Sequence, residues 1–275
     1  MPDVAATSGR GTSSRSPVYG LLVGASAGLL SGLFGIGGGI VIVPALIAFL
    51  SMERKLAHGT SLAATLPVAL ASLVTYAAGS NVDWPVAGCL AVGALAGAVA
   101  GTQLLQVIPK RPLTIIFIVV ILLTAVRLVL ADDALGRDPL TVGSALALVA
   151  IGVGTGTLSG LLGIGGGVVM VPAMVVLFGE IPVVAKGTSV AVIVPTSIVG
   201  TIRNRKHRNA DLPTATAVGL AGVVFAVIGS LLADSIGDAV SNTMFAVLLV
   251  VVAVIQFRSL RPTPAEAAGT HEAAS

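Results

Sequence analysis

One stretch of this sequence occurs twice. Residues 31–45 read SGLFGIGGGIVIVPA, and residues 159–173 read SGLLGIGGGVVMVPA, 128 positions later. Twelve of the fifteen positions are identical. Three consecutive glycines disfavour a continuous helix, because glycine exposes the backbone and loses the most conformational freedom on ordering. Each copy therefore predicts a break between two helical arms.

The surrounding composition indicates a membrane protein. Of 275 residues, 55% are hydrophobic and 10% are charged, whereas roughly a quarter are charged in a soluble domain. A bilayer core of about 30 Å needs roughly 20 apolar residues in a helix, and most of the uncharged runs reach that length. We therefore expect an all-α polytopic membrane protein. Its predicted helical segments are 17–34, 38–52, 59–79, 85–107, 112–131, 140–160, 166–179, 187–202, 212–234 and 240–258.

The repeat extends well beyond the glycines. Residues 57–63 match 185–191, and residues 81–85 match 209–213, always 128 positions apart. An internal duplication of about 110 residues follows from this constant offset. The predicted organisation is a disordered cytoplasmic tail (1–16), membrane repeat 1 (17–131), a linker (132–139), membrane repeat 2 (140–260) and a second cytoplasmic tail (261–275).

Loop charges predict how the repeats are inserted, because Lys and Arg collect on the cytoplasmic side of short loops. In repeat 1, residues 53–58 and 108–111 are basic, whereas 80–84 hold an acid and no cation. In repeat 2 the pattern is reversed, since 203–208 are basic and 234–238 are acidic. We therefore expect two inverted repeats of five helical segments each, in the inner (plasma) membrane, with both termini cytoplasmic. Whether each glycine hairpin spans the membrane or re-enters is left open.

Inverted repeats with broken helices are how many secondary transporters build a binding site at the membrane midplane. Here the glycines lead into helices, whose free N–H groups and positive ends favour an anion. No charged residue lies in the glycine segments, so a cation would find no carboxylate there. The predicted substrate-binding residues are Ser31, Gly35, Gly37, Gly38, Gly39, Thr60, Ser61, Ser159, Gly163, Gly165, Gly166, Gly167, Thr188 and Ser189.

Each of these residues also has a structural interpretation. The glycines could serve tight helix packing, as we expect for Gly93, Gly97 and Gly101, a stripe suited to contact within a subunit or in a homo-oligomer. The Gly-Thr-Ser hydroxyls could cap the helices that follow them. His58 and Lys186 occupy equivalent positions at opposite membrane faces and are either gates or interfacial anchors.

Other functional classes are disfavoured. The third glycine of a dinucleotide fingerprint is replaced by Ile40 and Val168, and no catalytic set of side chains is evident, so we expect no enzyme. The single cysteine, Cys89, lies in an apolar run and predicts neither a disulfide nor a metal site. Basic residues lie between spans rather than on one face, so we expect no nucleic-acid partner and no cofactor. We also expect no buried carboxylate for proton coupling.

The duplicated SGL(F/L)GIGGGxVxVP stretch, with its following Gly-Thr-Ser, resembles the TauE/SafE family, also called the 4-toluene sulfonate uptake permease family. The resemblance covers roughly residues 18–258 and implies a multi-pass carrier of sulfite or organosulfonates, often outward. We therefore expect a secondary transporter that exports such a small anion by alternating access, with the lipid bilayer as its other partner. The alternatives are an uncoupled anion channel and a non-transporting membrane scaffold. The identity of the anion, the direction and the coupling ion are left open.

Overall fold

The computed structural model describes residues 17–104, 110–130, 139–162, 166–236 and 238–259. These residues form ten α-helices and contain no strand. The helices are α1 (Pro17–Phe34), α2 (Gly39–Leu50), α3 (Arg54–Ala78), α4 (Trp84–Leu104), α5 (Lys110–Leu130), α6 (Val142–Leu162), α7 (Gly167–Phe178), α8 (Pro182–Lys206), α9 (Leu212–Ser235) and α10 (Asp238–Ser259).

All ten predicted segments are confirmed as helices, and α2 to α5 begin 128 residues before α7 to α10. Two helices begin five residues earlier than predicted. Helix α3 begins at Arg54 rather than 59, and α8 spans Pro182–Lys206 rather than 187–202. Proline suits the first position of a helix, and Arg203, Arg205 and Lys206 suit the last turn, where the helix dipole is negative. These cations therefore lie in helices, not in the loops where we expected them.

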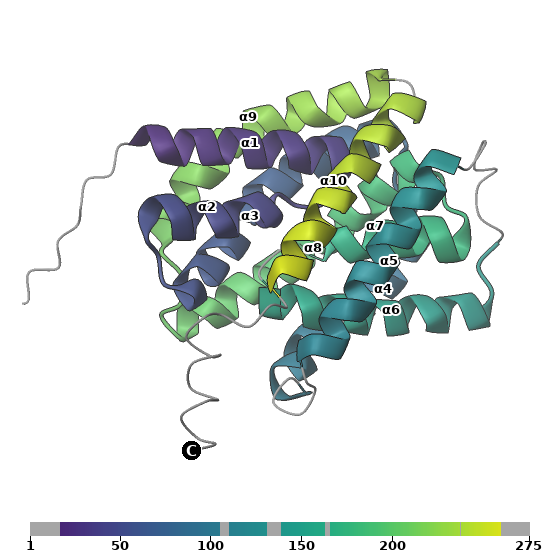
Figure 1. Ribbon diagram of the computed structural model, residues 1–275, viewed down its shortest axis with the longest axis horizontal. Helices are drawn as coiled ribbons and strands as arrows, with labels where there is room; N and C mark the ends of the chain where they lie inside the picture. Colours follow the sequence, from purple (N-terminus) through teal and green to yellow (C-terminus); the bar gives the residue numbers. More distant parts are fainter. Residues whose placement is uncertain (1–16, 105–109, 131–138, 163–165, 237, 260–275) are drawn as a thin grey trace, which may run out of the picture.

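The two repeats are interlocked rather than placed side by side. Helix α1 packs along α9, and α4 packs along α6, so the first helix of each repeat contacts the fourth helix of the other. Figure 1 shows the α1–α9 pair along one edge and the α4–α6 pair along the opposite edge. Helices α3 and α8 also contact each other, as do α5 and α10. Each repeat therefore supplies half of every major helix pair.

Contacts between α3 and α8 show that these equivalent helices run antiparallel. A Cβ atom on Gly59, near the start of α3, would lie 2.9 Å from Cβ of Asn204, near the end of α8. A Cβ on Gly187, near the start of α8, would lie 3.0 Å from Cβ of Tyr76, near the end of α3. The start of each helix thus lies beside the end of the other.

Glycine allows the interlocked helices to approach backbone to backbone. A Cβ on Gly28 of α1 would collide with the carbonyl of Gly222 in α9, and a Cβ on Gly156 of α6 would collide with that of Ala94 in α4. The packing role expected for Gly93 and Gly97 is confirmed, because each lies against a backbone carbonyl of α6. Such close approach is typical of helix pairs in membranes, where small residues line the interface.

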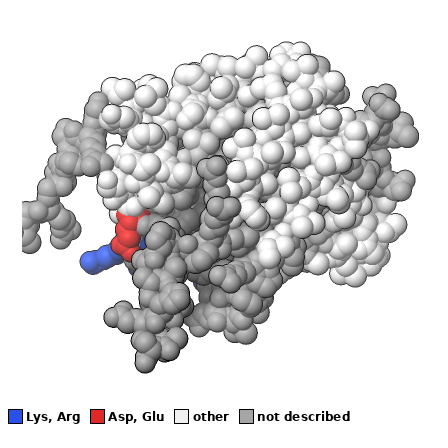
Figure 2. All heavy atoms as spheres, viewed as in Figure 1, with Lys and Arg blue, Asp and Glu red and all other residues white. Residues whose placement is uncertain are grey.

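The exterior is that of a membrane protein. On the face shown in Figure 2, the described surface is almost entirely uncharged, and the charged side chains gather at one end. Large apolar side chains are exposed along α1, α5, α6, α9 and α10. Within the described residues, three helical stretches are by themselves long and apolar enough to cross a bilayer: Lys55–Ala78, Pro182–Lys206 and Leu212–Ala233. The predicted all-α membrane fold is therefore confirmed.

We predict that Gly156→Leu lowers the thermal stability of the purified protein, because its side chain would force α6 away from α4. Overpacking of this kind costs about 1–3 kcal/mol. Gly154→Leu on the same helix is the matched control, since nothing lies within 4 Å of a Cβ at that position. Melting temperatures in detergent measure both variants. Equal losses for the two would contradict the packing described above.

Candidate functional site

The first glycine segment breaks the chain as predicted. Helix α1 ends at Phe34, and α2 begins after Gly38. Gly35, Gly37 and Gly38 have φ angles of 67°, 75° and 71°, a region that L-residues with a side chain rarely adopt. The Gly38 carbonyl then accepts the first bond of α2, from the N–H of Val41, at 3.0 Å. Glycine is therefore required here by backbone conformation.

The second glycine segment lies between α6 and α7. Helix α7 starts after Gly166, whose carbonyl accepts hydrogen bonds from Val169 and Met170 at 3.1 and 3.0 Å. Gly166 has a φ angle of −58°, so its conformation does not demand glycine. Two predicted site residues, Gly163 and Gly165, lie outside the described residues.

The structure brings the two glycine segments together. A Cβ on Gly167 would lie 2.5 Å from the carbonyl oxygen of Gly35 and 2.8 Å from Cα of Ile36. A Cβ on Gly37 would lie between Ile193 of α8, at 3.1 Å, and Thr65 of α3, at 3.2 Å. Thr65 and Ile193 are 128 positions apart, so the two repeats meet here at equivalent places. We call this meeting point the glycine junction.

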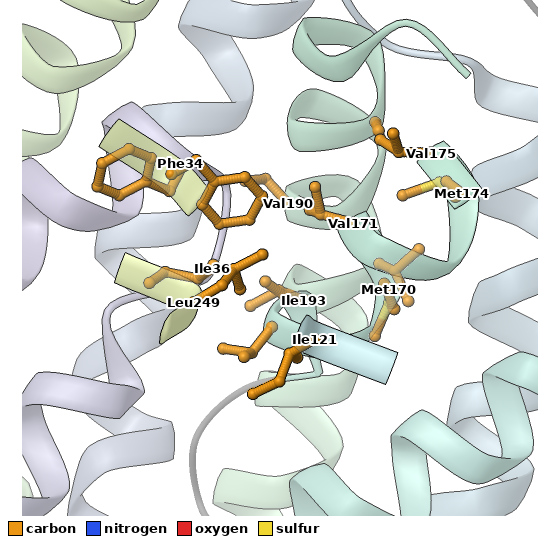
Figure 3. Packing of buried hydrophobic residues seen from close by; sticks show 14 of the residues in the cluster. Phe34, Ile36, Ile121, Met170, Val171, Met174, Val175, Val190, Ile193 and Leu249 are labelled. Atoms are coloured by element: carbon orange, nitrogen blue, oxygen red, sulfur yellow. The ribbon is translucent and has the colours of Figure 1, made fainter. Parts of the chain in front are cut away.

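The glycine junction is closed to the surface in this structure. Residues 35–39, 166 and 167 are all buried. Figure 3 shows Ile36, between two of the glycines, near Ile193 of α8 and Leu249 of α10 in the main hydrophobic core. An occupant could therefore reach the junction only if the surrounding helices move.

Two buried hydroxyl groups near the junction have no hydrogen-bond partner within the described part of the chain. Ser31 lies one turn before Gly35 and is 0% exposed, and Thr65 lies beside Gly37 and is 1% exposed. A buried hydroxyl without a partner costs roughly 1–3 kcal/mol, so such groups are candidates for binding a ligand. Ser31 was predicted from the sequence, and Thr65 was not. The signal for Thr65 was its spacing of four residues from Ser61, which places both on one helix face.

The Gly-Thr-Ser threonines join the repeats. Thr60 accepts a hydrogen bond from the N–H of Asp211, and Thr188 accepts one from the N–H of Asp83, both at 2.9 Å. Both threonines lie inside α3 and α8, so the alternative that they cap their own helices is wrong. They instead hold the residue that precedes the fourth helix of the other repeat. The same bond is thus made twice, at positions 128 apart.

The serines of the same triplets are fully buried. Ser189 donates to the carbonyl oxygens of Gly35, at 2.6 Å, and Lys186, at 2.7 Å, and so ties α8 to the first glycine segment. Ser61 is 0% exposed. Two further predicted site residues are also buried: Ser159 is 7% exposed, and Gly39 is the first residue of α2.

The two predicted gate residues differ in their surroundings. Lys186 is 2% exposed, and its Nζ donates to the hydroxyl of Ser241 in α10 at 2.7 Å, so it is not an interfacial anchor. His58 is half-buried near the start of α3.

The expectation that no carboxylate is buried is wrong, because Glu180 is 5% exposed. The Glu180 N–H donates to the carbonyl of Met174 at 3.2 Å, which folds the chain back against the end of α7.

The electrostatics of the junction favour an anion. Helices α2 and α7 both begin there, and the first N–H groups of a helix have no partner within it. Helix starts also carry partial positive charge. Residues 31–50 and 166–178 contain no Asp, Glu, Lys or Arg. Among the described residues, no group of three or more His, Cys, Asp or Glu could hold a metal ion.

Comparison with known proteins agrees with this architecture. The family model "Sulfite exporter TauE/SafE" matches residues 4–128 and 148–274. The chain belongs to the TauE/SafE family. Its match therefore includes both glycine segments and both Gly-Thr-Ser triplets.

Relatives of this TauE/SafE chain come from several bacteria and an archaeon. YunE of Bacillus subtilis (strain 168), described as a probable membrane transporter protein, is 30% identical over 208 residues, covering 66% of this chain and 76% of YunE. A probable membrane transporter protein of Xylella fastidiosa (strain 9a5c) is 27% identical over 242 residues, covering 86% of this chain and 91% of its own. MJ0441 of Methanocaldococcus jannaschii, also described as a probable membrane transporter protein, is 30% identical over 192 residues. The match covers 66% of this chain and 70% of MJ0441. No solved structure matches the chain significantly.

Proposed function

We propose that this membrane transporter is a secondary carrier that exports a small sulfur-containing anion, sulfite or an organosulfonate. Family membership and the descriptions of the relatives support the transporter class. The anion is supported by the glycine junction, where two helix starts meet in a segment without charged side chains. An oxyanion needs several hydrogen-bond donors, and the junction supplies them as N–H and hydroxyl groups.

The observation that carries this proposal is the pair of buried, unpartnered hydroxyls of Ser31 and Thr65 beside the first glycine segment. Their donors would be satisfied by a bound anion and not by the protein itself. The predicted glycines, with Ser61, Ser159 and Ser189, would surround the same place, whereas Thr60 and Thr188 would hold the helices in position.

The proposed mechanism is alternating access with the two glycine hairpins as opposed gates. The junction is buried from the surface, as expected for an occluded state between two open ones. Helices α3 and α8 run antiparallel, which supports repeats inserted in opposite directions and a path reaching the junction from each side. His58 and Lys186, at equivalent positions in these helices, would then lie toward opposite faces.

We predict that Thr65→Val reduces sulfite flux into proteoliposomes by at least about tenfold, because one hydrogen bond to a charged ligand contributes about 1.5–3 kcal/mol. Stability should be unchanged or slightly raised, since the lost hydroxyl has no protein partner. Ser31→Ala should behave in the same way. Melting temperature and initial flux rate are measured for each variant.

Thr216→Val is the matched control, because Thr216 is exposed and bonds only to the carbonyl of Leu212 in its own helix. Its flux should equal that of the wild type. Wild-type flux in Thr65→Val would contradict the proposed site. Sulfite accumulation driven by a pH gradient supports a carrier, whereas flux that is insensitive to the gradient would favour an uncoupled channel.

The proposed placement has inverted repeats in the inner membrane and both termini in the cytoplasm. Ser80 follows α3, and Arg208 follows α8 at the equivalent position of the other repeat. Both residues are exposed, and their φ angles are 60° and 57°. We predict that Ser80→Cys reacts with an impermeant maleimide from outside the cell and Arg208→Cys only after the membrane is opened. Both variants also carry Cys89→Ser, so that the introduced cysteine is the one thiol that can react. Labelling of both from the same side would contradict inversion.

A further inference from the structure

Besides Thr65 and Ile193, the repeats differ chemically at a second place beside the glycine junction. Lys186, Ser241 and Phe245 of repeat 2 correspond, at the offset of 128, to His58, Leu113 and Phe117 of repeat 1. Repeat 2 therefore has an amine and a hydroxyl where repeat 1 has an imidazole and an aliphatic side chain. Any function of the Lys186–Ser241 pair thus belongs to one side of the molecule only.

The pair is fully enclosed by protein. Lys186 is 2% exposed and Ser241 is 4% exposed, and the Lys186 Nζ lies 2.7 Å from the Ser241 hydroxyl oxygen. The same Nζ lies 5.7 Å from the centre of the Phe245 ring, within the range of a cation–π interaction. Because Ser241 accepts from Lys186, its own O–H remains able to donate. The pair therefore combines a basic amine with a hydroxyl donor.

Lys186 is also joined to the first glycine segment. A Cβ on Gly35 would lie 2.7 Å from Cα of Lys186, so the two backbones are in contact. Ser189 bonds to the carbonyls of both residues, at 2.6 and 2.7 Å. Phe34, immediately before Gly35, stacks on Phe245 with ring centres 5.3 Å apart. Movement of the first hairpin would therefore displace Lys186 and Phe245, which surround the Lys186–Ser241 hydrogen bond.

A lysine enclosed within a membrane helix bundle is costly, and such residues commonly mark the path of a charged substrate. The helix starts at the junction supply only partial charges, about half a unit each. A full positive charge next to the junction would offset the charge of an oxyanion far more completely. Placing it on one side only would make the two access routes unequal.

We propose that Lys186 and Ser241 form an anion subsite, contributed by repeat 2 alone, that compensates the charge of the substrate next to the first glycine hairpin. This inference rests on the proposed transport of a small oxyanion. Lys186 then binds the substrate through its ammonium group, and Ser241 both orients that group and donates its own O–H. Repeat 1 binds no anion at the equivalent place.

The test uses full-length protein and sulfite as the probe, with two readouts: the sulfite-dependent rise in melting temperature in detergent, and KM in proteoliposomes. Lys186→Gln should weaken apparent binding and raise KM by at least about tenfold, as for one lost charge-assisted hydrogen bond. Ser241→Ala should also weaken apparent binding and raise KM, each by a smaller factor. Lys206→Gln, which neutralises an exposed lysine at the end of the same helix, should match the wild type.

Binding and KM of Lys186→Gln within twofold of the wild type would overturn the subsite and leave the proposed function intact. Wild-type protein that neither binds nor transports sulfite or an organosulfonate would overturn both. If Lys186→Gln does not fold, Ser241→Ala decides alone, because it retains the charge: weaker binding supports the subsite, and unchanged binding overturns it.

Discussion

Close backbone contact at glycine is the constraint on which the rest of this structure depends. A side chain on Gly167 would collide with the carbonyl of Gly35, and a side chain on Gly35 would collide with the backbone of Lys186 in α8. Gly28 and Gly156 bring the long helices of opposite repeats into similar contact. In a bilayer, where apolar surfaces gain little from burial against one another, such contact is a main source of helix association. The glycines therefore break the helices and allow close packing at the same positions.

The interlocked pairing has a mechanical consequence. Because α1 packs on α9 and α6 packs on α4, neither repeat can form its main helix contacts alone. The bonds from Asp211 to Thr60 and from Asp83 to Thr188 join the repeats at two equivalent places. Any movement of one hairpin against the other would therefore be guided by a frame that both repeats share. Such a shared frame would suit the alternating access proposed above.

Much of this architecture followed from the sequence, because a constant offset of 128 and long apolar runs are local signals. The positions of all ten helices and both glycine breaks were predictable in this way. The start of α3 at Arg54 was not, since charged residues at a membrane surface are equally compatible with a loop. The burial of Lys186 and Glu180 was also missed, because it depends on neighbours distant in the sequence. Thr65 was missed for the same reason, as nothing local indicates that its hydroxyl has no partner.

Alternating access at the glycine junction is tested most directly by measuring whether the junction can be reached from both sides of the membrane. Ser31→Cys is nearly isosteric, lies beside the first break, and can be studied after the single native cysteine is removed by Cys89→Ser. We expect impermeant thiol reagents to modify this cysteine slowly from each side of the membrane, and we expect sulfite to protect it. Modification from one side only, or a rate that sulfite does not change while transport continues, would contradict alternating access at the junction.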